Sequence, residues 1–269
     1  MFNFIAETRI TRTKLIAPAL GFLHGVFLVL IVVLYSMSSY EDALYDQLVN
    51  KFTETSMSQQ EMALSLLSES HMLLNSRHKL FSGDDYIGMR DSLFRSADVQ
   101  LIDARFSCGS YSHVLGRLLQ RAGFEIRLAQ MKCDNVWGCH IVLEAKVDDR
   151  FVSLDSLYNV AFIRSDGKLA SFSEVGENWS DYKRQLPSGY PDWFAYEDVR
   201  YTNWSKIPLL MPAAKNLLSV FIGDKVNRVS VRSLVLNVYK AYLYILMTGY
   251  LMLIFFNIYV LVWRRGSRG

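Results

Sequence analysis

The sequence lacks a strong excess of charge of either sign. Its 29 Lys and Arg residues nearly balance 26 Asp and Glu residues over 269 positions, which leaves a formal net charge of +3. Nucleic-acid-binding proteins usually carry a clustered excess of basic residues, so we exclude nucleic acid as a partner. The sequence also shows no internal repeat and no low-complexity segment, which argues against a repeat architecture.

Charged residues are also missing from two long apolar stretches, one near each end of the chain. Hydrophobic residues make up 51% of the sequence and the mean hydropathy is +0.13, both high for a soluble protein. A helix over residues 15–37, rising about 1.5 Å per residue, crosses a hydrocarbon core of roughly 30 Å. Residues 241–263 form a second such stretch. We therefore predict two transmembrane helices. A cleaved signal peptide is the alternative for the first, but its apolar run is long and lacks a convincing cleavage site.

The charges that flank the first stretch predict its orientation. Arg9, Arg12 and Lys14 precede it, whereas Glu41 and Asp42 follow it. Cytoplasmic flanks of membrane spans are enriched in Lys and Arg. We therefore predict an integral protein of a bacterial inner membrane, with both termini in the cytoplasm and the middle of the chain in the periplasm.

The remaining segments differ in their patterning. Residues 38–95 have helical spacing of apolar residues and little strand signal, which predicts a helical connector. Residues 207–240 begin with an apolar run that Pro212 and Lys215 interrupt, so an interfacial helix is favoured over a third span. The predicted organisation is a cytoplasmic tail at 1–14, a span at 15–37, a connector at 38–95, an extracytoplasmic domain at 96–206, a juxtamembrane amphipathic segment at 207–240, a span at 241–263 and a cytoplasmic tail at 264–269.

The pattern within the domain changes at Cys108. The segment CGSYSHVLGRLLQRAG places its apolar residues on one helical stripe and ends at Gly123, so a helix is predicted to begin at Cys108. Three short alternating segments follow, FEIRLAQM, CHIVLEAKV and RFVSLDSL, and turn residues separate them. We therefore predict an α+β fold, in which one helix precedes three antiparallel strands.

Three residues on these elements have the arrangement of a Cys-His-Asp triad. Cys108 lies at the helix start, where unpaired backbone N–H groups lower the pKa of a thiol. His140 opens the second strand and Asp155 ends the third, and the end of a strand lies beside the start of its antiparallel partner. A turn at Asp148 and Asp149 predicts a register in which position 140 faces position 155.

These residues resemble a known family. The stretches SCGSYSHVLGRLLQRAGFEIRLAQM and GCHIVLEAKVDDRFVSLDSLYN are similar to the core of transglutaminase-like proteins, a branch of the papain-like cysteine enzymes, over residues 95–165. The resemblance implies that Cys108 is the nucleophile, that His140 is the general acid and base, and that Asp155 orients the imidazole. It also implies an oxyanion donor in the backbone N–H of Cys108, a thioester intermediate and no metal or cofactor. Ile141 and Val142 depart from the family, which often has an aromatic residue after the histidine.

Two functions follow from this resemblance. The first is a membrane-anchored periplasmic cysteine protease, amidase or acyltransferase that acts on a peptide, amide or acyl substrate in the cell envelope. The alternative is a non-catalytic accessory subunit of an envelope or polysaccharide-export assembly, because some relatives have lost activity. In the second case Pro18, His24 and Asn257 would pack against partner membrane proteins.

Several other residues have two interpretations. His113 is more simply a residue of the helix face than a second base. Cys133 and Cys139 form either a disulfide across a hairpin, with Cys108 left free, or two separate buried thiols. A zinc site at Cys139 and His140 is disfavoured, because adjacent strand residues point to opposite faces. The aromatic residues of 165–205 either line a cleft or pack an irregular segment.

Overall fold

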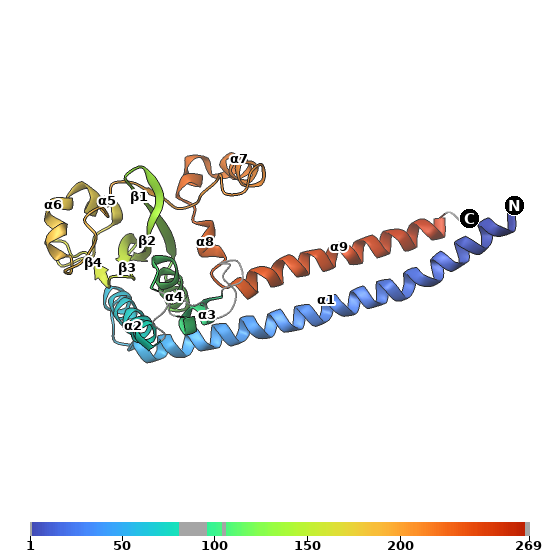
Figure 1. The fold of residues 1–269 in the computed structure, drawn as a ribbon, viewed down its shortest axis with the longest axis horizontal. Helices are drawn as coiled ribbons and strands as arrows, with labels where there is room; N and C mark the ends of the chain where they lie inside the picture. The colour runs from blue at the N-terminus through green and yellow to red at the C-terminus, as the bar shows by residue number, and fades with distance from the viewer. Residues whose placement is uncertain (1, 81–95, 104–105, 267–269) are drawn as a thin grey trace. The chain divides into compact units, whose positions relative to one another are not determined.

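A computed structural model describes residues 2–80, 96–103 and 106–266 (Figure 1). The chain forms two compact units. One unit consists of the two ends of the chain, up to Tyr40 and from Tyr239 onward, and the other runs from Glu41 to Val238. Residues 81–95 of the predicted connector lie outside the described residues.

The first unit consists of helix α9 (Val238–Gly266) and most of helix α1 (Phe2–Phe52). The segments Pro18–Phe52 and Val238–Val260 are long and apolar enough to cross a membrane. The Asn257 amide donates to His24 Nε2 at 2.7 Å, and the Tyr250 hydroxyl oxygen lies 3.3 Å from His24 Nδ1. His24 and Asn257 therefore bond to each other within the chain.

The second unit contains an antiparallel sheet of five strands in the order β4-β3-β2-β1-β5. The mixed α+β class and the helix followed by three antiparallel strands are confirmed. The structure adds two very short strands, one at each edge of the sheet. The strands are β1 (Ile126–Cys133), β2 (Val136–Val147), β3 (Arg150–Asp155), β4 (Val160–Ala161) and β5 (Val199–Arg200).

Helices cover both faces of the sheet. The helices of this unit are the end of α1, α2 (Gln59–Leu80), α3 (Ala97–Asp103), α4 (Cys108–Arg121), α5 (Phe172–Glu177), α6 (Trp179–Tyr182), η1 (Lys183–Gln185), α7 (Leu210–Ile222), η2 (Gly223–Arg228) and α8 (Val231–Leu234). One apolar cluster joins α4, α2 and α3 to one face of β1, β2 and β3. A second cluster, rich in aromatic residues, joins α5 and residues 190–196 to the opposite face.

Helix α4 lies at the centre of the first cluster. Every residue from Ser110 to Leu119 is buried. Gly116 allows the close approach of helix and sheet, because a β-carbon there would lie 3.1 Å from Leu143. On its outer side, Arg117 donates to Glu41 at 3.0 Å and to Asp42 at 2.5 Å, which ties the end of α1 to α4. The helix that begins at Cys108 is therefore held on all sides.

The predicted register of β2 with β3 is wrong by two residues. Asp148 and Asp149 both have positive φ, 46° and 64°, so they form a two-residue hairpin turn, which aspartate tolerates. Pairing consequently begins directly beside the turn, at Val147 and Arg150. Because a shift of two preserves the alternation of faces, Asp155 stays on its predicted side of the sheet.

Strand β2 contains a bulge at the position of the predicted histidine. Gln130 of β1 pairs with Ile141, whereas Lys132 pairs with Trp137, so two steps on β1 correspond to four steps on β2. The intervening residues 138–140 form the bulge, which begins at a glycine with φ 79°. A bulge redirects side chains from simple alternation, and His140 belongs to this one.

Candidate active site

The site lies where β2 extends beyond the end of β3. The last ladder pair of these two strands joins Leu143 and Leu154, so the backbone of β2 at Ile141 has no partner from β3. The start of α4 takes that place. Ser112 donates through its hydroxyl to the Ile141 carbonyl at 3.0 Å, and the Ile141 N–H lowers the pKa of the Cys108 thiol. Ile141 of β2 therefore lies beside the first turn of α4.

His140 and Asp155 form a buried pair. The imidazole Nε2 donates to Asp155 Oδ2 at 2.7 Å, and the two side chains are only 1% and 0% exposed. The other carboxylate oxygen, Oδ1, accepts from the N–H groups of Leu157 at 3.1 Å and Tyr158 at 3.4 Å. A carboxylate held by several donors in this way presents a fixed acceptor to the imidazole.

Cys108 completes the group, and the structure brings the three predicted residues together. The thiol of Cys108 and the imidazole of His140 lie close enough for each to shift the pKa of the other. Since Asp155 occupies Nε2 of the ring, Nδ1 is the nitrogen left for the sulfur. Cys108 is a free cysteine and is only partly buried.

Electrostatics favours a charged pair of sulfur and imidazole. Burial by itself raises the pKa of the Cys108 thiol, but the hydrogen bond and charge of His140 and the Ile141 N–H outweigh it, so the pKa is lowered. Burial likewise lowers the pKa of His140, but the charge and hydrogen bond of Asp155, together with Cys108, raise it to about 9. The two shifts favour the charged forms, the thiolate of Cys108 and the imidazolium of His140.

The first turn of α4 adds donors beside the sulfur. Ser107 caps the helix, and its carbonyl accepts the first backbone bonds, from the N–H groups of Ser110 and Tyr111, each at 3.1 Å. The N–H groups of Cys108 and Gly109 precede those bonds, at the end of the helix that carries partial positive charge. They can receive negative charge that develops on an oxygen next to the sulfur.

Aromatic residues support the histidine and the aspartate from the far face of the sheet. The Tyr190 hydroxyl donates to Asp155 Oδ2 at 2.9 Å and lies 3.3 Å from the Tyr196 hydroxyl. The Phe194 ring stacks on the His140 ring, with centroids 4.3 Å apart and planes 9° apart. The sequence alone does not distinguish Tyr190 and Phe194 from the other aromatic residues of 165–205, because their local pattern is the same as that of aromatic residues that only pack.

The structure decides between the interpretations of His113 and of the cysteine pair Cys133 and Cys139. His113 Nε2 hydrogen-bonds with the Leu236 carbonyl at 2.7 Å, which agrees with its interpretation as a helix-face residue. Of the two alternatives for Cys133 and Cys139, the structure has the disulfide. Within the described ranges, His, Cys, Asp and Glu side chains form no group of three that would hold a metal ion.

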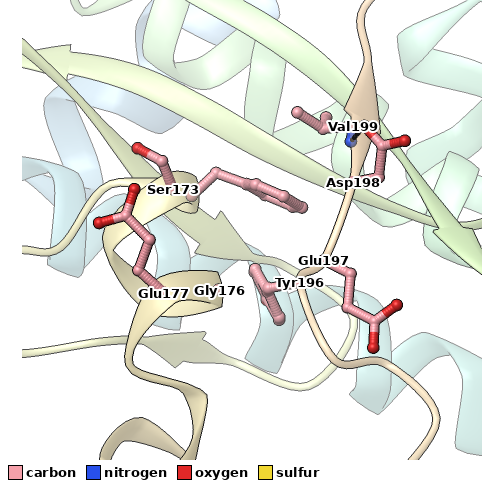
Figure 2. Close-up of a pocket in the computed structure, with 8 residues that line it drawn as sticks. Ser173, Gly176, Glu177, Tyr196, Glu197, Asp198 and Val199 are labelled. Atoms are coloured by element: carbon pink, nitrogen blue, oxygen red, sulfur yellow. Dashed lines mark hydrogen bonds between the residues drawn. The ribbon is translucent and has the colours of Figure 1, made fainter.

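A separate pocket of about 430 Å³ lies between α5 and residues 196–199 (Figure 2). Glu177, Glu197 and Asp198 give its lining a negative character. It contains none of the three triad residues, so we do not assign the reaction to it. Tyr196 lines this pocket and also contacts the site, since its hydroxyl lies 3.3 Å from that of Tyr190. Its backbone carbonyl lies so close to Gly176 that a β-carbon would not fit there.

No family model matches this chain, and comparisons with curated proteins and with solved structures give no match either. The geometry of the site and the family resemblance of its residues are therefore what indicates a function.

Proposed function

We propose that the chain is a membrane-anchored, transglutaminase-like cysteine hydrolase or acyltransferase that acts on an amide or ester. One observation carries this proposal. A buried imidazole is held by Asp155 at 2.7 Å through one nitrogen, and Cys108 lies close enough to this imidazole for each to shift the pKa of the other. This is the constellation of nucleophile, base and orienting acceptor that acyl transfer requires.

The first half of the proposed reaction forms a thioester. The Cys108 thiolate attacks the carbonyl carbon, and the carbonyl oxygen takes the negative charge near the first N–H groups of α4. The imidazolium of His140 then gives its proton to the leaving amine or alkoxide as the bond from carbon to that group breaks. The acyl group remains on sulfur, and the imidazole is neutral.

The second half releases the acyl group. Neutral His140 accepts a proton from water or from an amine as that nucleophile attacks the thioester carbon. Collapse of the tetrahedral intermediate expels the Cys108 thiolate, which restores the initial charged pair. Asp155 does not change its protonation in this scheme, because its role is to orient the ring and to stabilise the imidazolium.

The charge state of the site supports catalysis over a purely structural role. Desolvation makes an isolated buried charge costly, so an accessory subunit gains little from holding Asp155 at 0% exposure beside a raised histidine pKa. Strongly perturbed pKa values with specific charge partners are typical of catalytic groups.

The anchoring of the protein in the inner membrane is part of the same proposal. The two apolar helices anchor the chain in the inner membrane, and the charges flanking the first of them favour cytoplasmic termini. The Cys133–Cys139 disulfide supports an oxidising compartment for the catalytic unit, such as the periplasm.

An activated ester tests the chemistry without knowledge of the natural substrate. The full chain in detergent is mixed with p-nitrophenyl acetate, and released nitrophenol and protein mass are followed together. We expect a burst of nitrophenol, an acetyl group on Cys108 and then slow turnover, which a small primary amine accelerates if the enzyme transfers acyl groups.

Two variants provide the controls. Cys108→Ser should abolish the burst, and His140→Ala should slow acylation while the protein remains folded by circular dichroism. If acetylation of Cys108 is as slow in the parent as in His140→Ala, the proposed role of the histidine is wrong.

A further inference from the structure

Helix α7 turns its apolar side away from the protein. None of its residues from Leu210 to Ile222 is buried. Leu217 and Phe221 lie seven and eleven positions after Leu210, which places all three on one stripe of the helix. Leu210 and Leu217 are each 64% exposed, and Phe221 is 77% exposed. A surface helix normally buries that stripe, so the arrangement of α7 is inverted.

The half-buried residues of α7 are Met211, Ala214, Lys215 and Ser219, and the principal neighbour of α7 is the short helix η2. Val220 extends the outward apolar surface and is 79% exposed. A contiguous exposed apolar surface on a folded unit marks a site that another phase or partner covers.

The surrounding charges indicate what covers it. Residues 206–232 contain five basic residues, Lys206, Lys215, Lys225, Arg228 and Arg232, and one acidic residue, Asp224. Basic residues beside an apolar helical stripe are typical of helices that lie in the surface of an anionic bilayer. The same chain continues directly into α9, which is apolar and long enough to cross a membrane, so a bilayer is the partner consistent with both features.

We propose that α7 is an interfacial helix that binds an anionic lipid surface. Leu210, Leu217 and Phe221 enter the region below the headgroups, and Lys215 stays at headgroup level, because its long side chain can extend to the charged layer. The inference does not depend on the proposed catalysis, since it uses none of the triad residues.

A fluorescent label on α7 tests the proposal in the full chain. Cys108→Ser removes the free thiol, and the joined pair Cys133 and Cys139 does not react. A bimane label is placed at Leu217→Cys or, as a matched control, at Asn216→Cys, which lies about 100° around the helix. Both proteins are incorporated into nanodiscs of phosphatidylglycerol, with either doxyl-labelled lipid or aqueous iodide as quencher.

We expect the label at position 217 to shift its emission to the blue, to be quenched by doxyl lipid and to lose iodide quenching. The label at position 216 should keep its iodide quenching. Equal iodide quenching at both positions, without doxyl quenching, would overturn the proposal. Protection of position 217 from both quenchers would also overturn it, because that result indicates a protein partner.

Discussion

Helices α4 and α7 have similar lengths, 14 and 13 residues, and both have an apolar stripe, yet the structure treats them in opposite ways. The sheet, α2 and α3 surround α4, and its residues from Ser110 to Leu119 are buried. No residue of α7 is buried. An amphipathic pattern therefore specifies a helix, but the elements around it decide whether that helix builds a core or offers a surface. The proposed reactivity of Cys108 depends on the first outcome, because the packing of α4 on the sheet places Cys108 beside His140 and Ile141 of β2.

The largest difference between the two helices should appear when one leucine of each is shortened. Leu118 of α4 is completely buried, whereas Leu217 of α7 is 64% exposed. Leu118→Ala should lower the free energy of unfolding by about 2–5 kcal/mol, because it leaves a cavity in the core. Leu217→Ala in detergent should change it by less than about 0.5 kcal/mol. Denaturant unfolding of both variants measures the two values, and equal losses would contradict the comparison.

A smaller loss is expected when the hairpin that carries His140 is loosened. The Cys133–Cys139 disulfide joins the end of β1 to the bulge in β2. Closing a short loop contributes about 2 kcal/mol through the entropy of the unfolded chain. The double variant Cys133→Ser with Cys139→Ser should lose about that amount and should slow acylation of Cys108. Reduction of the parent by mild reductant provides a second route to the same state, and an unchanged acylation rate in both would show that the disulfide does not position the histidine.

The smallest effect is expected when Asp155 loses its hydrogen bond from Tyr190. Tyr190→Phe removes the hydroxyl that donates to Asp155 Oδ2 and should lower the free energy of unfolding by about 1.5 kcal/mol. With one donor fewer, the carboxylate interacts more strongly with the imidazolium, so the pKa of His140 should rise above its value of about 9. With an amide or alkyl ester as substrate, whose leaving group needs the proton of His140, the alkaline limb of the acylation rate should then move to higher pH.

Tyr182→Phe is the matched control for that shift. Tyr182 packs against the same aromatic cluster, through Phe162, but does not contact Asp155. It should leave the alkaline limb in place. An alkaline limb that moves equally in both variants would assign the effect of Tyr190 to general packing.

Much of the central arrangement could be predicted from the sequence because it is local. The stripe and end signals of α4 placed Cys108 at the first helical residue, where the structure has it. The alternating segments predicted the three long strands, and the aspartates between them predicted the turn. These features depend on residues that are close in sequence, so their periods are visible without the fold.

The parts that sequence reasoning missed depend on distant contacts. The bulge at residues 138–140 and the tight turn at Asp148 and Asp149 make the observed strand register differ from the predicted one. The local sequence does not specify the pairing of two strands to within one or two residues. Tyr190 and Phe194 reach the site from a segment far along the chain. The strands β4 and β5 are each two residues long, too short for an alternating pattern.

The central claim is that α4 and β2 together hold a thiolate and an imidazolium, and the pH dependence of Cys108 alkylation measures it most directly. An ordinary thiol reacts in proportion to its thiolate, with a pKa of about 8.5. The pKa of Cys108 is lowered and the pKa of His140 is raised to about 9, and both shifts favour the charged pair. Iodoacetamide should therefore alkylate Cys108 faster at neutral pH than it alkylates an ordinary thiol, and His140→Ala should restore the pH dependence of an ordinary thiol. Acylation by an amide or alkyl ester, whose leaving group needs a proton, should decline as pH rises through about 9, because His140 loses the proton that it gives to the leaving group. An alkylation rate that follows an ordinary thiol in the parent and does not change in His140→Ala would contradict the account.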